Sequence, residues 1–250
     1  MILADYHTHT TFCDGNNTPE EMVVSAIEKG MDELGFSVHC HMQFSDAYGL
    51  KLQDTDRYFS ELSALREKYA DKIRIHIGVE QEYYSNIPTD RFEYIIGSVH
   101  FLFDGNKYYP IDSAPEGLPI AVNEAFGGDW YLMAEHYYDT VSDVVRKTGA
   151  DIIGHFDLIT KFNETHNYFD ATNDRYITAA KKAIDKLIPY GKPFEINTGA
   201  ISRGYRTTPY PSFDLIDYIK EKGGKFILSS DSHSAENLCF EFDKWEYLLK

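Results

Sequence analysis

Two pairs of residues near the ends of the chain have the types and spacing needed to bind a metal ion. His7 and His9 follow a short apolar run at the N-terminus, and Asp231 and His233 follow the last apolar run. One residue separates the members of each pair, so in an extended backbone both side chains point to the same side. Each pair can therefore bring two ligand atoms to one cation. An isolated His-x-His is also common on protein surfaces, so either pair alone is a weak indication.

Other predicted strands also end in residues that can bind a metal. We expect seven strands, and only the one over 194–196 ends in a residue outside this class, Asn197. A parallel barrel brings the carboxyl ends of all its strands to one face, whereas an open sheet gathers only those near its switch point. The pattern therefore favours a barrel. The further candidate ligands are His39, Glu80, His100 and His155.

This set of side chains is too large for one ion. A catalytic zinc ion takes three protein ligands and a water molecule, and a structural zinc ion takes four ligands. We therefore predict two or three divalent ions, with a carboxylate bridging at least one pair. Glu80 is the natural bridge because its strand lies in the middle of the set. Any single member could instead cap a strand, but the complete set favours metal binding.

The segments between these positions alternate between strand and helix patterns. Such alternation with short connections indicates parallel βαβ units with right-handed crossovers. Thr18-Pro19-Glu20-Glu21 is a typical helix start with a capping box. The strands are expected at 2–4, 33–38, 73–79, 94–99, 151–154, 194–196 and 225–230, and the helices at 19–29, 58–69, 134–145, 177–187 and 213–222, with a last helix from Ser234.

The segment Phe101–Asp129 breaks this alternation. Asp104-Gly105-Asn106 lies between aromatic residues and predicts a hairpin, and a stretch rich in Pro and Gly follows. We expect a loop insertion near the site that could act as a lid. No change in composition marks a domain boundary, so we expect residues 1–250 to form one domain.

The composition limits the possible partners. Apolar residues make up 43% of the chain, and the formal net charge of −16 argues against a nucleic-acid backbone as partner. A small phosphorylated substrate remains compatible, because bound cations would invert the local field. The three cysteines are scattered, and neither a signal peptide nor a membrane span is recognisable. We therefore expect a cytoplasmic protein without disulfides or membrane contact.

The candidate ligands, taken in order, resemble the motifs of the polymerase and histidinol phosphatase (PHP) superfamily, from residue 7 to residue 233. Glu195-Ile196-Asn197-Thr198, Arg203 and Tyr210-Pro211-Ser212 further resemble the stand-alone histidinol-phosphate phosphatases of that superfamily. The resemblance implies a distorted (β/α)7 barrel with its active site at the C-terminal ends of the parallel strands. The matching motifs are His7-Thr8-His9, Asp14-Gly15, His39, Gly78-Val79-Glu80, Gly97-Ser98-Val99-His100, Gly154-His155-Phe156-Asp157 and Ser230-Asp231-Ser232-His233.

The resemblance also implies three sites for divalent ions, commonly zinc, manganese or iron. Asp14 stands where many relatives have a histidine, and Val38 stands where relatives usually have an acidic residue. The implied ligands are His7, His9, Glu80 and Asp231 for the first ion, Glu80, His100 and His155 for the second, and His39, His233 and Asp14 for the third.

The activity implied is hydrolysis of a phosphate monoester, L-histidinol phosphate, by a metal-bridging hydroxide that attacks phosphorus in line. The chain has neither a Gly-rich phosphate cradle nor an activated Ser or Cys elbow, which agrees with a mechanism without a phospho-enzyme. Glu80, Asp231 and His233 would be catalytic, with His233 or His41 as candidate general acid or substrate contact. Arg203, Lys161 and Arg206 would hold phosphate oxygens, although each could be an ordinary loop cation.

Three alternatives remain open at this point. A PHP-type phosphoesterase could act on a nucleotide, an oligonucleotide or a phosphotyrosyl peptide instead. A non-catalytic metal-binding accessory module would carry the same ligands without turnover. An amidohydrolase-type enzyme would share the first His-x-His, but it normally needs a bridging lysine after a middle strand, and no lysine stands there.

Overall fold

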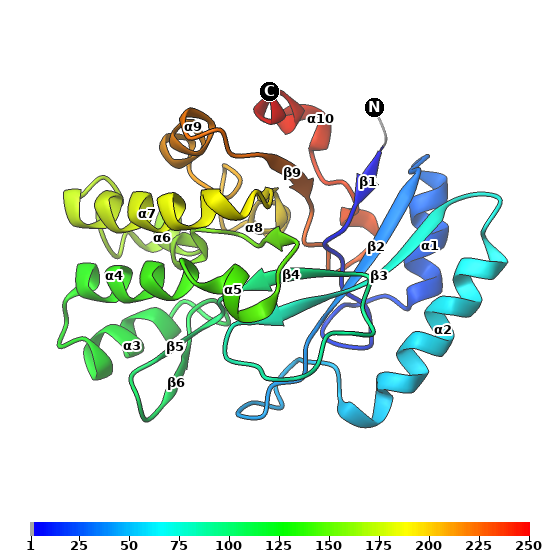
Figure 1. Ribbon diagram of the computed structural model, residues 1–250, viewed down its shortest axis with the longest axis horizontal. Helices are drawn as coiled ribbons and strands as arrows, with labels where there is room; N and C mark the ends of the chain where they lie inside the picture. Colours follow the sequence, from blue (N-terminus) through cyan, green and yellow to red (C-terminus); the bar gives the residue numbers. More distant parts are fainter. Residues whose placement is uncertain (1–2) are drawn as a thin grey trace.

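Seven parallel strands form the central sheet, and helices cover its outer surface (Figure 1). The computed structural model describes residues 3–250. The strands are β1 (Ala4–Asp5), β2 (Glu33–His39), β3 (Arg74–Glu82), β4 (Tyr94–Ser98), β7 (Ile152–Ile153), β8 (Phe194–Asn197) and β9 (Phe226–Ser229). They lie side by side in the order of the chain, and every neighbouring pair is parallel. The carboxyl ends of all seven strands therefore face one side.

The two outer strands of the sheet meet just beyond their carboxyl ends. Thr8 and Ser232 form a parallel bridge. The amide of His9 donates to the carbonyl of Ser232 at 2.8 Å, and the amide of Ser232 donates to the carbonyl of His7 at 3.1 Å. The sheet is thus nearly closed, and the predicted distorted (β/α)7 barrel is confirmed.

A buried carboxylate strengthens this closure. Asp5 in β1 accepts hydrogen bonds from the amides of Ser230 at 3.2 Å and Cys239 at 3.1 Å, and from the hydroxyl of Ser230. Burial raises the pKa of Asp5, and these hydrogen bonds oppose that effect. The first strand is therefore tied to the last by side-chain as well as backbone contacts.

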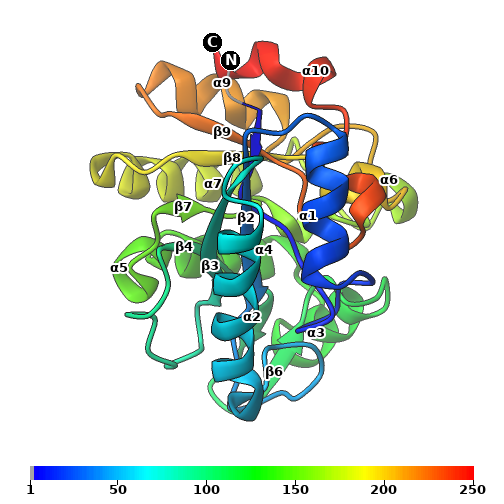
Figure 2. The same ribbon diagram turned by 90° about the vertical axis from the view of Figure 1, so that its right-hand side faces the viewer.

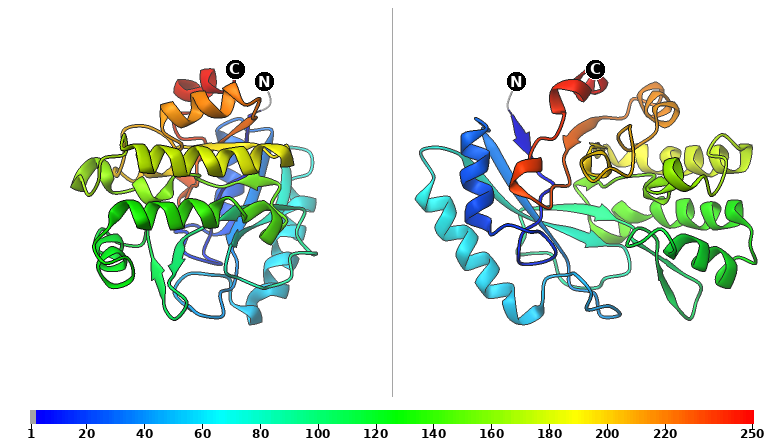
Figure 3. Two further views of the ribbon diagram at one scale, coloured as in Figure 1. Left: turned by 60° about the vertical axis from the view of Figure 1, so that its left-hand side comes forward. Right: turned by 180° about the vertical axis from the view of Figure 1, so that it is seen from behind.

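The two largest of four apolar clusters in residues 3–250 lie between the strands and the helices. In one, α1 and α2 pack on β2 and β3 through buried side chains such as Leu34 and Tyr58; Figure 2 shows both helices in front of these strands. In the other, α4 and α7 lie side by side (Figure 3), and Tyr138 donates a hydrogen bond to the hydroxyl of Tyr176 at 2.7 Å. The helices are α1 (Pro19–Glu28), α2 (Thr55–Lys68), α3 (Gly117–Ala125), α4 (Trp130–Val141), α5 (Val144–Thr148), α6 (Asn163–His166), α7 (Asp174–Leu187), α8 (Gly199–Ser202), α9 (Phe213–Glu221) and α10 (Phe242–Trp245). Across residues 3–250, we find no helix with the length and apolar character required to cross a membrane.

The predicted start of the first helix is confirmed. Thr18 caps α1, its hydroxyl accepts from the amide of Glu21 at 3.3 Å, and the Glu21 carboxylate accepts from the amide of Thr18 at 2.8 Å. This reciprocal pair is the capping box that the sequence indicates. It fixes the direction in which the chain leaves the loop after β1.

The insertion at residues 101–129 contains more regular structure than we predicted. The hairpin is confirmed, since β5 (Phe101–Phe103) and β6 (Tyr108–Pro110) pair in antiparallel fashion. The prediction of a loop after it is wrong for 117–125, which form α3. Pro119 lies in the first turn of α3, where the missing N–H costs no helical hydrogen bond, and Leu118 and Val122 are buried.

Three other predicted segments differ clearly from the structure, and further boundaries shift by up to three residues. The helix expected over 134–145 is divided into α4 and α5, because Ser142 ends α4 with its hydroxyl donating to the carbonyl of Asp139 at 2.6 Å. The helix expected from Ser234 is only a short 3-10 turn over 235–237. The first strand covers Ala4–Asp5, and Ile2 lies outside the described residues.

Candidate metal centre

Glu80 lies at the centre of the imidazoles that the strands bring together. Only 1% of its side chain is exposed, and the register of β2 and β3 places it opposite His39. Its Oε2 lies 2.8 Å from Nδ1 of His39 and 3.2 Å from Nε2 of His7. Its Oε1 lies 2.9 Å from Nε2 of His155 and 3.1 Å from Nε2 of His100. One carboxylate thus faces imidazoles from four different strands or strand ends.

Asp231 connects this centre to Arg203. Its Oδ1 lies 3.3 Å from Nε2 of His9 and 3.7 Å from Nε2 of His7. Arg203 donates from Nη2 to Asp231 Oδ2 at 3.0 Å and from Nη1 to the Asp231 carbonyl at 2.8 Å. Asp231 has φ 48°, a left-handed conformation that is unusual for a residue other than glycine. This backbone geometry lets one residue contact both the imidazoles and the guanidinium group.

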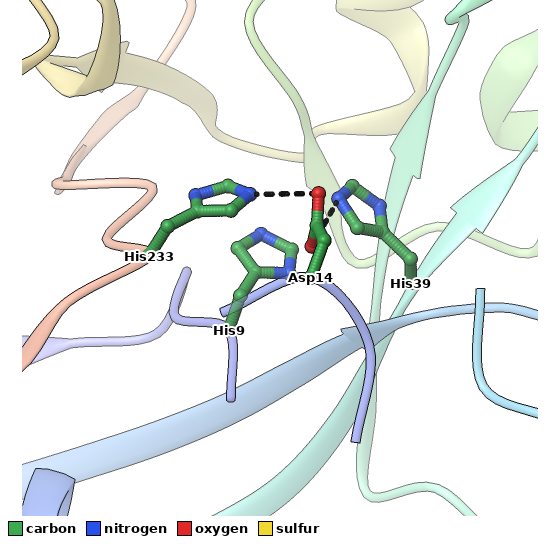
Figure 4. A group of neighbouring side chains, drawn as sticks. All are labelled: His9, Asp14, His39 and His233. Carbon is green, nitrogen blue, oxygen red and sulfur yellow. Dashed lines mark ion pairs between the residues drawn. The ribbon is translucent and has the colours of Figure 1, made fainter. Parts of the chain in front are cut away.

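A second, outer part of the cluster surrounds Asp14. Figure 4 shows the Asp14 carboxylate between the rings of His233 and His39. The distances are 3.3 Å to Nε2 of His233 and 3.6 Å to Nε2 of His39. His9 stacks on both of these rings, with centroids 4.2 Å apart in each case. Asp14 is 37% exposed, so this part of the cluster meets solvent.

Two further carboxylates lie behind the imidazoles, and we did not predict either as a site residue. Oε1 of Glu195 lies 2.6 Å from Nδ1 of His7, and Oε2 of Glu82 lies 3.1 Å from Nδ1 of His100. Glu195 also accepts from the amide of His155 at 2.8 Å. A carboxylate behind an imidazole fixes the tautomer and orientation of the ring and makes it a stronger ligand.

The sequence contains a signal for both carboxylates. Glu195 lies between Phe194 and Ile196 in a strand that is buried throughout. Since a buried carboxylate without partners is costly, its presence in such a strand indicates a partner. Glu82 follows Glu80 by two residues in one strand, so both side chains point to the same side.

The residues present fit divalent metal ions. Nε2 of His7, Nε2 of His9 and Oε2 of Glu80 are buried and lack a hydrogen bond within the described residues, which is rare for buried polar atoms. Four groups of side chains offer ligand atoms that lie within 4.8 Å of one another. These groups are His9, Asp14, His39 and His233; His7, Glu80 and His155; His7, His9 and Asp231; and His39, Glu80 and His100.

The electrostatics of the cluster also suit cations. Burial and the neighbouring His39 and His233 lower the pKa of His9 to about 3, so its imidazole is neutral, the form that binds metals. Burial alone would raise the pKa of Asp231, but the charges of Arg203 and His7 hold it well below its usual range. The cluster therefore combines ionised carboxylates with at least one neutral imidazole.

His7 shows that this site needs positive charge. Burial would lower its pKa, yet the charges of Glu195, Glu80 and Asp231 raise it well above its ordinary value. Without a cation, the carboxylates thus hold a proton on His7. A divalent ion would replace such a proton, because metal binding and protonation compete for the same nitrogen.

The predicted substrate-binding residues lie in different surroundings. Arg203 is 26% exposed, and its Nη1 also lies 3.1 Å from Nδ1 of His233, so it borders the cluster. Lys161 donates from Nζ to the carbonyl of Asp112 at 2.7 Å and to its Oδ2 at 3.2 Å. Among these residues, Arg203 is the cation in direct contact with candidate ligands.

Arg206 and His41 do not touch the cluster. Arg206 is buried, donates to the carbonyls of Thr208 and Pro209 at 3.2 Å each and to the hydroxyl of Thr160, and packs over the Tyr210 ring. The ring of His41 forms no hydrogen bond or ion pair with a candidate ligand anywhere in residues 3–250. It lines a small cavity with apolar neighbours such as Leu50, Phe59 and Phe92.

The fold and the cluster define a barrel with a multinuclear metal centre at the carboxyl ends of its strands. The family model of the PHP domain matches residues 5–199, which is more than half of the chain. The chain belongs to the PHP domain family.

Relatives and solved structures agree with this assignment. The chain is 28% identical to a Deinococcus radiodurans protein named "Probable histidinol-phosphatase", over 96% of this chain and 90% of that protein. It resembles the crystal structure of a Listeria monocytogenes protein named HisK, with a TM-score of 0.83, 22% identity and coverage of 97% and 99%. It also resembles the histidinol phosphate phosphatase HisK of Lactococcus lactis, solved with zinc, L-histidinol and phosphate, with a TM-score of 0.73, 24% identity and coverage of 99% and 92%.

Proposed function

We propose that the protein is a metal-dependent phosphatase that hydrolyses L-histidinol phosphate to L-histidinol and phosphate. The observation that carries this proposal is the buried Glu80 carboxylate, surrounded by the imidazoles of His7, His39, His100 and His155. The name of the Deinococcus radiodurans relative and the ligands of the Lactococcus lactis structure support the choice of substrate. The pathway served would be histidine biosynthesis.

The cluster would hold two or three divalent ions of zinc, manganese or iron. When bound, such ions supply an acidified water as nucleophile and neutralise charge on the phosphoryl oxygens. His7, His9, Glu80 and Asp231 would hold the first ion, with Glu80 shared by a second ion at His100 and His155. His39, Asp14 and His233 would hold the outer ion.

The other polar residues of the site would bind and orient the ester. Arg203 presents a partly exposed guanidinium group next to Asp231, and this planar cation suits phosphate oxygens. Arg203 also fixes Asp231 and His233 through its hydrogen bonds to both. Proton transfer at the ester oxygen would take place on the side of His233, whose partly exposed ring lies beside Arg203.

A substrate panel tests this function. The protein, purified and loaded with manganese or zinc, is assayed for phosphate release from L-histidinol phosphate, a nucleoside monophosphate, phosphotyrosine and p-nitrophenyl phosphate. We expect kcat/KM for L-histidinol phosphate to exceed that of every other ester at least about tenfold. Turnover of another ester without release from L-histidinol phosphate would reject the substrate but keep the metal chemistry. A metal-loaded, folded protein without turnover on any ester would favour a binding module.

A further inference from the structure

The insertion that interrupts the barrel pattern places a carboxylate beside the metal centre. The amide of Ile111, just after β6, donates to the carbonyl of His100 at 3.0 Å, so Asp112 follows directly after a contact with a candidate ligand. The Asp112 side chain is 21% exposed. Burial would raise its pKa, but the charges of Lys161, His100 and His155 lower it, so the carboxylate is ionised.

Lys161 holds one side of Asp112 and leaves the other side free. Its Nζ donates to the Asp112 carbonyl and to Oδ2, and it lies over the rings of Phe162 and Tyr205 at 5.4 and 5.5 Å. The Lys161 side chain is only 11% exposed, so its charge is used inside the protein. Oδ1 of Asp112 accepts no hydrogen bond from any residue of the described chain. An ionised carboxylate with one oxygen free of protein donors can bind a second cationic partner.

Other carboxylates around the cluster already have partners. Glu195 faces His7, Glu82 faces His100, and Asp14 faces two imidazoles. Asp112 differs from these three because its partner is a lysine outside the cluster and one of its oxygens is free. It is therefore the best placed of the four to bind a charged group of a ligand.

Tyr48 supports a ligand subsite in the same place. Its hydroxyl is buried and has no hydrogen-bond partner among residues 3–250. Its ring meets the His39 ring edge to face, with centroids 4.7 Å apart, and lies 6.3 Å from the His100 ring. Burial and then the charge of Asp112 raise the pKa of Tyr48 well above its ordinary value. An unused phenol and a carboxylate with an unused oxygen thus both lie near His100.

We propose that Asp112 binds the ammonium group of the substrate and that Lys161 is the positioning residue that holds Asp112 in place. This inference rests on the proposed function. In L-histidinol phosphate the amine is on the carbon next to the esterified methylene group. When the phosphoryl group is at the metal centre, the ammonium group must therefore lie close to the cluster. Asp112 supplies a fixed negative charge beside His100, and Arg203 supplies a fixed positive charge beside Asp231.

The test compares the natural ester with its deamino analogue, 3-(imidazol-4-yl)propyl phosphate, in wild type and in Asp112→Asn. For L-histidinol phosphate, we expect kcat/KM of Asp112→Asn to fall about 10- to 100-fold, mainly through KM, because the neutral amide cannot form the ion pair with the ammonium group. For the deamino analogue, the variant and wild type should agree within about twofold. Glu116→Gln is the matched control, since Glu116 belongs to the same insertion and its exposed side chain forms no hydrogen bond within residues 3–250. It should match wild type on both esters.

Lys161→Met tests the positioning role. We expect it to raise KM for L-histidinol phosphate by less than Asp112→Asn does, and to leave the deamino analogue unchanged. Equal losses on both esters would show that Lys161 binds phosphate, which contradicts the positioning role. For Asp112→Asn, equal losses on both esters, or no loss on either, would overturn the inference. Metal content and circular dichroism of each variant show whether a loss of activity is due to misfolding. If wild type releases no phosphate from L-histidinol phosphate, the proposed function fails, independently of any variant.

Discussion

The inner and outer parts of the cluster are built from the same residue types but are supported differently. Around Glu80, which is 1% exposed, two of the imidazoles have a second carboxylate behind them, Glu195 and Glu82. Around Asp14, which is 37% exposed, the rings of His39 and His233 are held by stacking on His9. The other ring nitrogen, Nδ1, faces a carboxylate of the inner part in both cases, Glu80 at 2.8 Å for His39 and Asp231 at 3.6 Å for His233. Two inner rings thus have carboxylates of their own, whereas the outer rings share Glu80 and Asp231 with the inner part.

Charges interact more strongly in the buried inner part than in the exposed outer part. Charges interact more strongly where water is excluded, and a buried carboxylate needs a positive partner. In the inner part the partner is a proton on His7 or a metal ion. Water and salt screen the charges of the outer part. We therefore expect inner ions to bind tightly and the outer ion to exchange readily.

The largest effect should follow from Glu80→Gln. This change removes a fully buried charge that faces imidazoles on both of its oxygens, so it should weaken both inner ions together. We expect fewer bound ions per chain and a loss of kcat/KM of more than about 100-fold, which exceeds the usual effect of changing a residue behind a ligand. Metal analysis and the rate on L-histidinol phosphate measure it. A folded variant that keeps its ions and its rate would contradict the central role of Glu80.

The sequence predicts the convergence of the imidazoles around Glu80 well because they follow apolar strands. His39, His100 and His155 come directly after hydrophobic runs whose direction a parallel barrel dictates, and all three meet at Glu80. The residues behind them were harder to predict. Glu195 lies inside a strand, and only the three-dimensional structure shows which imidazole lies next to it. Local sequence patterns therefore predict the direction of each strand. They do not predict which side chains, distant in sequence, lie next to each other.

The insertion at residues 101–129 shows the same limit of prediction from local sequence patterns. The hairpin at Asp104-Gly105-Asn106 has a local turn signal and is confirmed. The helix α3 has Gly and Pro in its first turn, which favoured a loop, and it is stabilised by burial of Leu118 and Val122 against the rest of the fold. Tertiary packing overrode a local preference here. The position of Asp112 beside the metal centre depends on that packing and could not be predicted.

A smaller effect should follow from Glu195→Gln. The variant keeps a hydrogen-bond acceptor for Nδ1 of His7 but removes the negative charge that makes the imidazole a stronger ligand. We expect inner metal affinity or kcat/KM to fall about 10- to 100-fold. Isothermal titration with zinc, together with rates at saturating metal, measures the change.

Glu33→Gln is the matched control for this variant. Glu33 is also buried, and its Oε2 lies 2.9 Å from Nε2 of His76, but this pair lies at the amino ends of the strands, away from the cluster. It should change the melting temperature without changing metal content or rate. If Glu195→Gln also changes the melting temperature without changing metal content or rate, the carboxylate behind His7 contributes only to stability.

The smallest effect should follow from Asp14→Asn. The amide keeps an oxygen ligand, and water can enter this exposed part, so the loss of one screened charge costs less than it does around Glu80. We expect the variant to lose one ion at chelator concentrations that leave the inner ions bound, and kcat/KM to fall less than about tenfold. The metal content of Asp14→Asn is measured along a chelator titration and compared with that of wild type and Glu195→Gln. The chelator concentration at which each ion is lost ranks the ions by affinity. Loss of all ions together in Asp14→Asn would mean that the two parts bind metal as one unit, since a change at the exposed carboxylate would then release ions from the buried one.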